Sequence, residues 1–162
     1  VDALKRFSAP DRDERRPFDL VEVIERAVQW VGKATANQFE VKLNLPPALD
    51  VLGSPGQVQQ VVMNLVQNAA DATENARERR LEITGRSEDG QALIEFRDSG
   101  PGIPAANLDK IFDPFFTTKP VGRGTGLGLA ISYGIVERHG GKLAADNHPR
   151  GGALFTLRLP LA

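Results

Sequence analysis

The sequence predicts an α/β fold, a two-layer sandwich in which a mixed, mostly antiparallel sheet is covered on one face by about three helices. Three stretches have the apolar spacing of helices, at residues 18–34, 54–73 and 126–139. Runs of alternating apolar and polar residues lie between and after them. Strand pairs that lie between helices and are connected mainly as hairpins are typical of a sheet with its helices on one side.

The first helix is expected to begin after Asp19. This residue can act as the N-cap, Glu22 follows three residues later, and Phe18 and Val23 are spaced for a hydrophobic staple. Before it, residues 1–17 contain a short helical stretch and the charged segment PDRDERRP, which is predicted to be a linker. The folded unit should therefore start near Phe18.

The other elements follow along the chain. FEVKLNLP alternates as a strand, and DVLG is a short extended piece before the second helix, where Ser54 can cap and Pro55 occupies the first turn. LEITGRSEDGQALIEFRD predicts a hairpin that turns at EDG. A short helix is expected at residues 104–111, whereas residues 112–124 have little periodicity. A Gly-Gly pair ends the third helix, and KLAADN and ALFTLRLP supply two final strands.

Composition excludes several classes of protein. Charged residues make up 25% of the 162 residues and the net charge is −1, so no global field attracts nucleic acid or an anionic membrane. Without Cys the chain can form neither a disulfide nor a thiolate metal site, and His139 and His148 are expected to be structural or surface residues. No apolar run approaches the roughly 18 residues that span a bilayer. Because the chain begins at Val1, we expect an excised piece of a longer, cytoplasmic protein.

The second helix has amides where a surface helix would have charges. Between residues 54 and 73 the only charged side chain is Asp71. Unpaired buried amides cost about 1–3 kcal/mol each, so they should bind neighbouring loops, ordered water or a polar ligand. An Asn carbonyl oxygen suits Mg²⁺, which usually shares its coordination shell with phosphates. Five polar side chains fall within an arc of about 80° on the helical wheel: Gln57, Gln60, Asn64, Asn68 and Asp71.

A glycine-rich segment, GRGTGLGLAIS, opens the third helix. Alternating glycines there would let backbone N–H groups approach an anion at the positive end of the helix, although a flexible hinge is the alternative. The segment does not match the ordinary phosphate-binding loop GxxxxGK[ST]. From residue 114 to residue 136 the ionisable side chains, apart from Tyr133, are Lys119 and Arg123. Lys119 suits a terminal phosphate and Arg123 could reach two oxygens, unless they are simply solvated.

A second glycine-bearing segment, DSGPGI, ends the hairpin. It fits GxGxxA after a strand, but Pro104 follows at once and no acidic residue stands at a strand end about twenty positions later, as dinucleotide binding requires. Asp98 could instead accept a hydrogen bond from the exocyclic amine of a base. The alternative is that Asp98 only stabilises the turn.

Four segments, NLVQNAADA, DSGPGI, DPFFTTKP and GTGLGL, resemble in order and spacing the N, G1, F and G2 boxes of sensor histidine kinases. The resemblance covers about residues 18–162, and VDALKRFSAP looks like the end of a helix of the dimerisation hairpin. The run TTKPVGRGTGLGLAISYGIVERHGG is similar to the nitrogen-regulation and dicarboxylate-sensing subgroup. The resemblance implies that residues 18–162 are a catalytic domain that holds ATP beneath a flexible lid at residues 112–126.

The same resemblance assigns roles to individual residues. Asn68 would coordinate Mg²⁺ and Asp98 would bind adenine. Gly100 and Gly102 would leave room for the base. Asn64 and Lys119 would assist catalysis, and Phe115 and Phe116 would anchor the lid. The residues expected around the triphosphate are Lys119, Arg123, Gly124, Thr125, Gly126, Leu127 and Gly128.

Asn64 also favours a kinase over an ATPase. Related ATP-hydrolysing families, such as gyrases and heat-shock chaperones, have a Glu four residues before the magnesium Asn. An amide cannot take a proton from water, so the γ-phosphoryl would be kept for a better nucleophile, a histidine. The acceptor box is absent here, so the chain by itself is not expected to phosphorylate itself.

The resulting hypothesis is the catalytic domain of a histidine kinase, with ATP and Mg²⁺ as cofactors and no nucleic acid as partner. Its expected partners are the dimerisation hairpin of its own parent protein, a homodimer, and a response regulator, while the piece itself is expected to be a monomer. Two alternatives share the fold, a serine kinase of the anti-sigma or mitochondrial dehydrogenase-kinase type and a nucleotide-binding regulatory module without transfer chemistry. A membrane anchor in the parent is left open.

Overall fold

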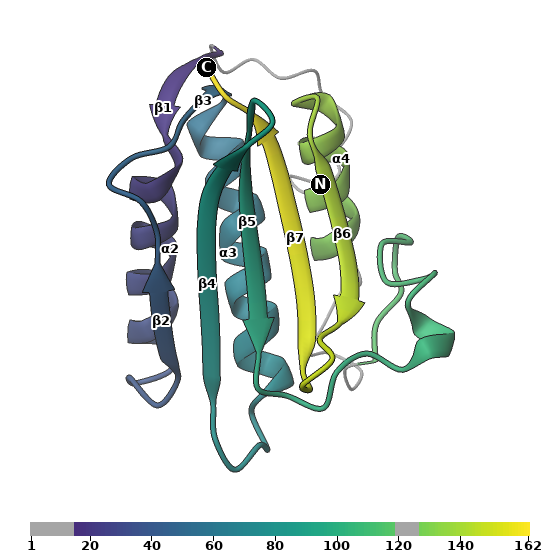
Figure 1. Ribbon diagram of the computed structural model, residues 1–162. Helices are drawn as coiled ribbons and strands as arrows, with labels where there is room; N and C mark the ends of the chain where they lie inside the picture. Colours follow the sequence, from purple (N-terminus) through teal and green to yellow (C-terminus); the bar gives the residue numbers. More distant parts are fainter. Residues whose placement is uncertain (1–14, 119–126) are drawn as a thin grey trace.

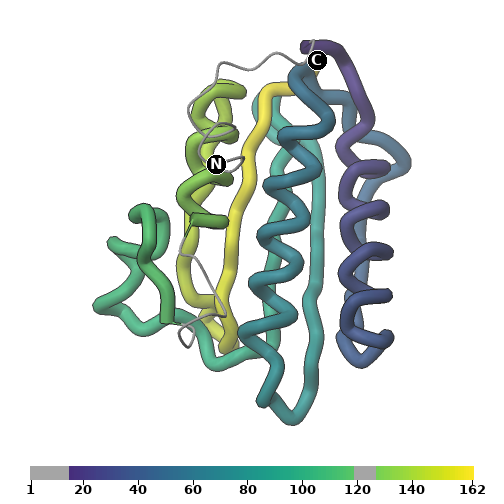
Figure 2. The backbone as a smooth tube through the Cα atoms, turned by 180° about the vertical axis from the view of Figure 1, so that it is seen from behind, coloured from purple at the N-terminus to yellow at the C-terminus, as the bar shows by residue number. Residues whose placement is uncertain are grey.

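Three helices lie side by side on one face of a five-stranded sheet within residues 15–118 and 127–162, the part of the chain that the computed structural model describes (Figures 1 and 2). These two layers confirm the predicted α/β sandwich. In chain order the elements are β1 (Arg16–Asp19), α2 (Leu20–Ala34), β2 (Glu40–Asn44), β3 (Asp50–Gly53), α3 (Pro55–Ala72), β4 (Arg80–Glu88), β5 (Gln91–Asp98), a 3₁₀ turn (Ala105–Asn107), α4 (Gly128–Arg138), β6 (Lys142–Asn147) and β7 (Ala153–Pro160).

The sheet has the strand order β2-β4-β5-β7-β6. β2 is parallel to β4 and the other neighbouring pairs are antiparallel, which confirms the predicted mixed, mostly antiparallel sheet. The β4–β5 hairpin turns at Asp89 and Gly90, which both have positive φ (52° and 76°), in agreement with the predicted EDG turn. β1 and β3 form a separate two-stranded sheet. Arg16 and Pro17, which we predicted to be linker, are therefore part of the fold.

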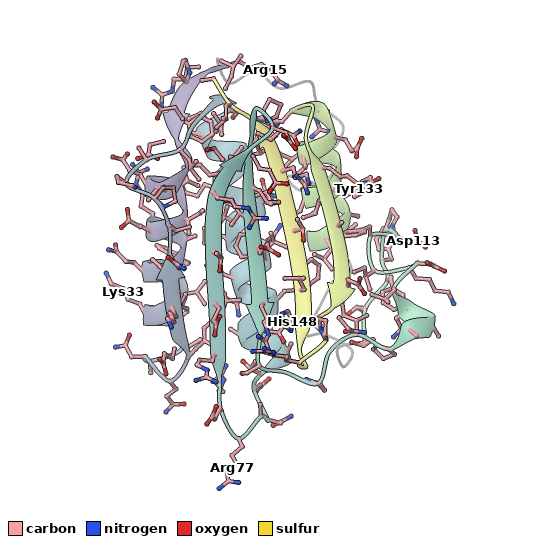
Figure 3. The ribbon with its side chains drawn as sticks, in the orientation of Figure 1. Arg15, Lys33, Arg77, Asp113, Tyr133 and His148 are labelled. Carbon is pink, nitrogen blue, oxygen red and sulfur yellow. The ribbon has the colours of Figure 1, made fainter. Side chains whose placement is uncertain are left out.

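Side chains of the sheet alternate between the helices and solvent, as strand geometry requires. Ile83 of β4 and its cross-strand partner Phe96 of β5 are buried under the helices. On the opposite face Arg86 donates to Glu95 at 3.2 Å. Figure 3 shows that polar and charged side chains cover this open face of the sheet. The main core cluster therefore lies between the two layers.

The start of α2 confirms the predicted cap. Asp19 Oδ1 accepts hydrogen bonds from the backbone N–H groups of Val21 and Leu49, both at 3.0 Å. The first bond caps the helix and the second holds the loop before β3 against it. Because the helix is amphipathic, its apolar face packs on the sheet beside α3 while its polar face stays in solvent.

The start of α3 is tied to the end of α4 through a histidine. Ser54 caps α3 by accepting from the Gln57 N–H at 3.4 Å, and the Ser54 N–H donates to His139 Nε2 at 3.0 Å. His139 Nδ1 lies 2.8 Å from the Ile135 carbonyl oxygen and therefore donates to it. His139 is 5% exposed, and a Cβ at Gly53 would collide with its ring. The prediction that His139 is structural is confirmed.

The short helix predicted at residues 104–111 is present only as a 3₁₀ turn, so its predicted length is wrong. Only Ala105–Asn107 form a 3₁₀ turn, and Pro104 before it makes no side-chain cap. The following N–H groups of Lys110 and Asp113 bond to carbonyls three residues back, which continues a chain of turns. Without a cap, so short a segment does not gain enough hydrogen bonds to form an α-helix.

Two predicted segments fall wholly or partly outside the described residues. These are the helix end and linker at residues 1–14 and the C-terminal part of the predicted lid, residues 119–126. The third predicted helix is confirmed from Gly128 onward. Within the described ranges, none of the helices has the length and apolar character needed to cross a membrane.

Candidate functional site

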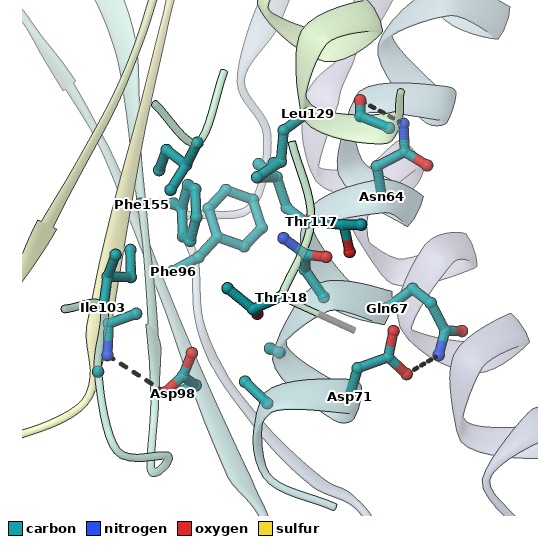
Figure 4. A pocket seen from close by; sticks show the side chains of 18 of the residues that line it. Asn64, Gln67, Asp71, Phe96, Asp98, Ile103, Thr117, Thr118, Leu129 and Phe155 are labelled. Atoms are coloured by element: carbon teal, nitrogen blue, oxygen red, sulfur yellow. Dashed lines mark hydrogen bonds between the residues drawn. The ribbon is translucent and has the colours of Figure 1, made fainter. Parts of the chain in front are cut away.

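A cavity of about 830 Å³ lies between α3 and the adjoining end of the sheet (Figure 4). Its walls come from the second half of α3, the end of β5, the start of β7, the loop after β5 and the start of α4. Polar side chains lie on the helix wall, whereas Phe96, Phe155 and Ile103 make the sheet side apolar. The residues that line the cavity include Asn64, Asn68, Asp71, Asp98, Gly102 and Ile103.

The helix wall brings together part of the predicted amide stripe. Asn64, Asn68 and Asp71 line the cavity, whereas Gln57 and Gln60 do not. Gln57 Oε1 is buried without a hydrogen-bond partner among the described residues. The stripe is therefore split, because the cavity reaches only the last three turns of the helix.

Asn64 connects α3 to the start of α4. Its Nδ2 donates to the Gly128 carbonyl oxygen at 3.1 Å and to Ser132 Oγ at 3.0 Å. A carbonyl oxygen can only accept, so the atom facing Gly128 must be the amide nitrogen. The Asn64 nitrogen is therefore explained by hydrogen bonds within the protein, which was one of the two explanations for the amides of this helix. Oδ1 is the Asn64 atom that remains for a ligand.

Asn68 is placed differently. It lies one turn further along α3, is half-buried, and lines the cavity. Its amide makes no hydrogen bond within residues 15–118 and 127–162. The preceding residue, Gln67, donates from Nε2 to Asp71 Oδ1 at 3.0 Å, which orients the Asp71 carboxylate (Figure 4). A half-buried amide that has no protein partner and faces a cavity is available to a polar ligand.

Asp98 lies on the sheet side of the cavity and is only 6% exposed. Its Oδ1 accepts from the N–H of Gly100 at 2.8 Å and from the N–H of Ala153 at 3.2 Å. Burial raises the pKa of this carboxyl above its ordinary value, and the two N–H groups offset part of that increase. Asp98 does stabilise the turn, as one alternative held, but it uses one oxygen for this and leaves Oδ2 for the cavity.

The two glycines of DSGPGI are required by protein neighbours. A Cβ at Gly100 would lie 2.9 Å from the Ala72 carbonyl oxygen and 3.1 Å from Asp98 Oδ1. Gly102 has φ +84°, and a Cβ there would lie 2.7 Å from Asn147 Oδ1. Gly102 lines the cavity and Gly100 does not. These contacts supply a reason for both glycines that the sequence did not reveal.

The aromatic residues before the predicted lid differ from one another. Phe116 is half-buried and lines the cavity, whereas Phe115 is 69% exposed and has φ +68°. Phe112, which sequence reasoning missed, packs its ring against Tyr133 and Phe155, with centroids 5.2 and 6.4 Å apart. No local pattern could have identified it, because the chain around it forms turns and bends and not a helix.

The residues expected around a triphosphate are only partly described. Gly128 lines the cavity, and a Cβ there would lie 3.8 Å from the Asn64 carboxamide. Leu127 packs against the core and is not part of the cavity wall. The other expected residues lie outside the described ranges: Lys119, Arg123, Gly124, Thr125 and Gly126.

Comparisons with known proteins agree with this geometry. Residues 53–162 match a family described as histidine kinase-, DNA gyrase B-, and HSP90-like ATPase. The whole chain is 39% identical to the two-component sensor PprA of Pseudomonas aeruginosa and spans 18% of that protein. It is 34% identical, over 93% of its length, to the C4-dicarboxylate transport sensor protein DctB of Rhizobium meliloti, of which it spans 24%.

A solved structure gives the corresponding result for the fold. The nucleotide-free catalytic domain of histidine kinase ThkA superimposes with a TM-score of 0.78 and 36% identity. The superposition covers 91% of this chain and 95% of the ThkA domain. The similarity in fold therefore extends over most of this chain.

Proposed function

The chain belongs to the family of histidine kinase-, DNA gyrase B- and HSP90-like ATPases, among the ATP-binding domains of sensor histidine kinases, and from this premise we propose how its cavity works. Mg²⁺-ATP binds between α3 and the end of the sheet, and the γ-phosphoryl passes to a histidine on a separate dimerisation hairpin. The observation that supports this most directly is that Asn68 and Asp98 line one cavity from opposite layers.

Asp98 is proposed to bind the adenine base. Its Oδ1 is held by two N–H groups, so Oδ2 faces the cavity in a defined direction and can accept from the 6-amino group. The apolar surface of Ile103 and Phe96 beside it suits the faces of a purine. A hydrogen bond from a neutral donor to a buried carboxylate contributes about 1.5–3 kcal/mol, which is enough to select the base.

Asn68 is proposed to hold the magnesium ion, with Asn64 Oδ1 assisting. A neutral amide oxygen that makes no hydrogen bond among the described residues is a donor that Mg²⁺ accepts. The described residues contain no group of three or more His, Asp or Glu side chains that could hold a metal ion by themselves. Mg²⁺ would therefore need phosphate oxygens to complete its shell, and when bound it would neutralise charge on the transferred phosphoryl group.

The arrangement of Asn64 supports phosphoryl transfer over hydrolysis. The amide hydrogens of Asn64 are used by Gly128 and Ser132, and its oxygen cannot remove a proton from water. An attacking water would thus have no general base on this helix position. Lys119, proposed to contact the terminal phosphate, would stabilise transfer to the hairpin histidine.

The partners are proposed from the relatives. PprA is described as a two-component sensor, and the chain spans less than a quarter of both PprA and DctB. We propose that the parent protein is a homodimer that supplies the hairpin and acts on a response regulator. We also propose that the chain is related to the nitrogen-regulation and dicarboxylate-sensing kinases. The match to the dicarboxylate sensor DctB supports this relation, although PprA matches as well.

Two measurements test this function. Calorimetry of the folded chain should detect binding of ADP or a non-hydrolysable ATP analogue, and the affinity should increase with Mg²⁺. Incubation with a separately produced hairpin and labelled ATP should yield an acid-labile phosphohistidine. An acid-stable phosphoserine would instead favour the serine-kinase alternative, and nucleotide binding without transfer would favour a regulatory module.

A further inference from the structure

We propose that Asn147 is a positioning residue for the nucleotide cavity: its side-chain amide holds Ile103 and thereby sets the sheet-side wall. Asn147 is the last residue of β6, is exposed, and does not line the cavity itself. It acts through the loop that follows β5, which passes the end of β6 (Figures 1 and 2). This inference rests on the proposed function, because it assumes that the cavity takes an adenine nucleotide.

The contact with Ile103 uses both halves of the amide. Asn147 Oδ1 accepts from the Ile103 N–H and Asn147 Nδ2 donates to the Ile103 carbonyl oxygen, both at 2.7 Å. Two parallel bonds to one residue fix its backbone orientation as a neighbouring strand would. Ile103 lines the cavity, so the direction of its side chain depends on this pair of bonds.

Gly102 is adapted to the same contact. Its φ of +84° is a conformation that L side chains rarely adopt, and a Cβ would lie 2.7 Å from Asn147 Oδ1. Any side chain at this position would separate Asn147 from Ile103. The second glycine of DSGPGI is therefore explained by the Asn147 contact, in addition to its place on the cavity wall.

The end of the β6–β7 hairpin also holds Asp98. The Ala153 N–H donates to Asp98 Oδ1, and a Cβ at Gly152 would collide with the Asp98 carbonyl oxygen. Asn147 and Ala153 are neighbours across β6 and β7. One rigid hairpin end thus positions both Asp98 and Ile103, which keeps the base acceptor and the apolar wall in a constant relation.

Loss of the Asn147 contact should lower affinity through the population of the competent loop. If the loop after β5 occupies its binding position only part of the time, the apparent dissociation constant equals the intrinsic one divided by the fraction of molecules with the loop in that position. Two exposed hydrogen bonds of ordinary strength predict a decrease in affinity of about five- to tenfold. The strands and helices should keep their stability, because Asn147 lies at the surface.

The test compares Asn147→Ala with Asn44→Ala in the whole chain. Asn44 is the matched control because it is also an exposed asparagine at the last residue of an edge strand, β2. Calorimetry should show a five- to tenfold weaker affinity for Mg²⁺-ADP in Asn147→Ala and no change in Asn44→Ala, with similar thermal midpoints for both. Amide hydrogen exchange by NMR should be at least about tenfold faster at Ile103 only in Asn147→Ala. With a separate hairpin, KM for ATP should increase while kcat is kept.

Three outcomes would overturn the proposal. One is wild-type affinity for Mg²⁺-ADP in Asn147→Ala, even if the Ile103 amide exchanges faster. Another is unchanged exchange at Ile103, since the contact would then not hold the loop. A third is equal weakening by Asn44→Ala, which would indicate a general effect of edge strands. Failure of the unmodified chain to bind any adenine nucleotide would refute the proposed function itself, and it is recognised because the exchange at Ile103 is measured without nucleotide.

Discussion

The two walls of the cavity are built in different ways. On the helix wall, Asn64 and Asn68 come from successive turns of α3, so their common direction follows from helix geometry alone. On the sheet wall, Asp98 and Ile103 are held by Ala153 and Asn147, which are 55 and 44 residues away in the chain. The helix wall is thus a local structure, whereas the sheet wall exists only after the sheet has assembled.

This difference predicts how each wall responds to mutation. A change at Asn68 on the helix wall should affect one interaction with the ligand, because α3 persists without it and the Asn68 amide makes no hydrogen bond among the described residues. A change on the sheet wall should affect both the ligand and the loop geometry, because the same atoms serve both. Substitutions on each wall and a change of pH test this distinction.

The largest effect is expected for Asp98→Asn. Asn can still accept from the Gly100 and Ala153 N–H groups through Oδ1, so its Nδ2 would face the cavity and oppose the 6-amino group of adenine. Affinity for Mg²⁺-ADP should fall by about 30-fold, or about 2 kcal/mol, which lies within the range for a lost hydrogen bond to a charged group. Calorimetry should show this loss, whereas Asp109→Asn, at an exposed turn, should bind as the unmodified chain does.

Asn68→Ala should have the next largest effect. It removes the proposed magnesium contact from the helix wall, so affinity for Mg²⁺-ADP should fall about tenfold while affinity for metal-free ADP is unchanged. The control is Gln60→Ala, another amide of the same helix that does not line the cavity. Titrations with and without Mg²⁺ measure the difference, and a loss of equal size in both would argue against a metal contact.

Ser132→Ala tests the bond between α3 and α4. Ser132 is fully buried and accepts from Asn64 Nδ2, so the substitution should lower the free energy of unfolding by about 1 kcal/mol. Nucleotide affinity should stay within about twofold, because Gly128 still holds the same amide. Urea unfolding and calorimetry together provide the test. A large loss of affinity at unchanged stability would mean that Ser132 contacts the ligand more directly.

The smallest effect is expected from pH, and its sign follows from Asp98. Burial raises the pKa of this carboxyl in the folded chain, so Asp98 favours folding below its unfolded pKa, and this contribution is lost as pH rises through the folded pKa. Above that pH, Asp98→Asn should therefore unfold at a slightly higher temperature than the unmodified chain, with the gap closing on acidification. Nucleotide affinity should also fall on acidification, because a protonated Asp98 Oδ2 carries a hydrogen that opposes the 6-amino group of adenine. Thermal midpoints measured between neutral and acidic pH decide the sign.

Much of the fold could be predicted because its signals are local. The cap at Asp19, the turn at Asp89 and Gly90, and the spacing of apolar residues in α3 all lie within a few residues of the structure they determine. Residues 104–111 form only a 3₁₀ turn and not the longer helix that was predicted, because no local cap is available to start one. The pairing of β1 with β3 could not be predicted, because nothing near Arg16 specifies a strand more than thirty residues away.

The residues of the candidate site also differ in whether a local pattern identified them. Amide periodicity identified Asn64 and Asn68, and the resemblance of DSGPGI identified Asp98 and Gly102. Asn147 carried no signal, because its partner Ile103 lies on another element.

The sequence by itself determined most of the helices and strands and the amide face of α3, because these signals lie within a few residues of one another, and the order of its motifs determined the family of the chain. Only the tertiary structure decided that the Asn64 side-chain nitrogen donates to α4 and that one oxygen of Asp98 stays available. It also decided that the β6–β7 hairpin holds the loop after β5. The physical reason is that hydrogen-bond partners of buried polar groups are chosen by which elements pack together, and packing joins residues that the chain keeps far apart.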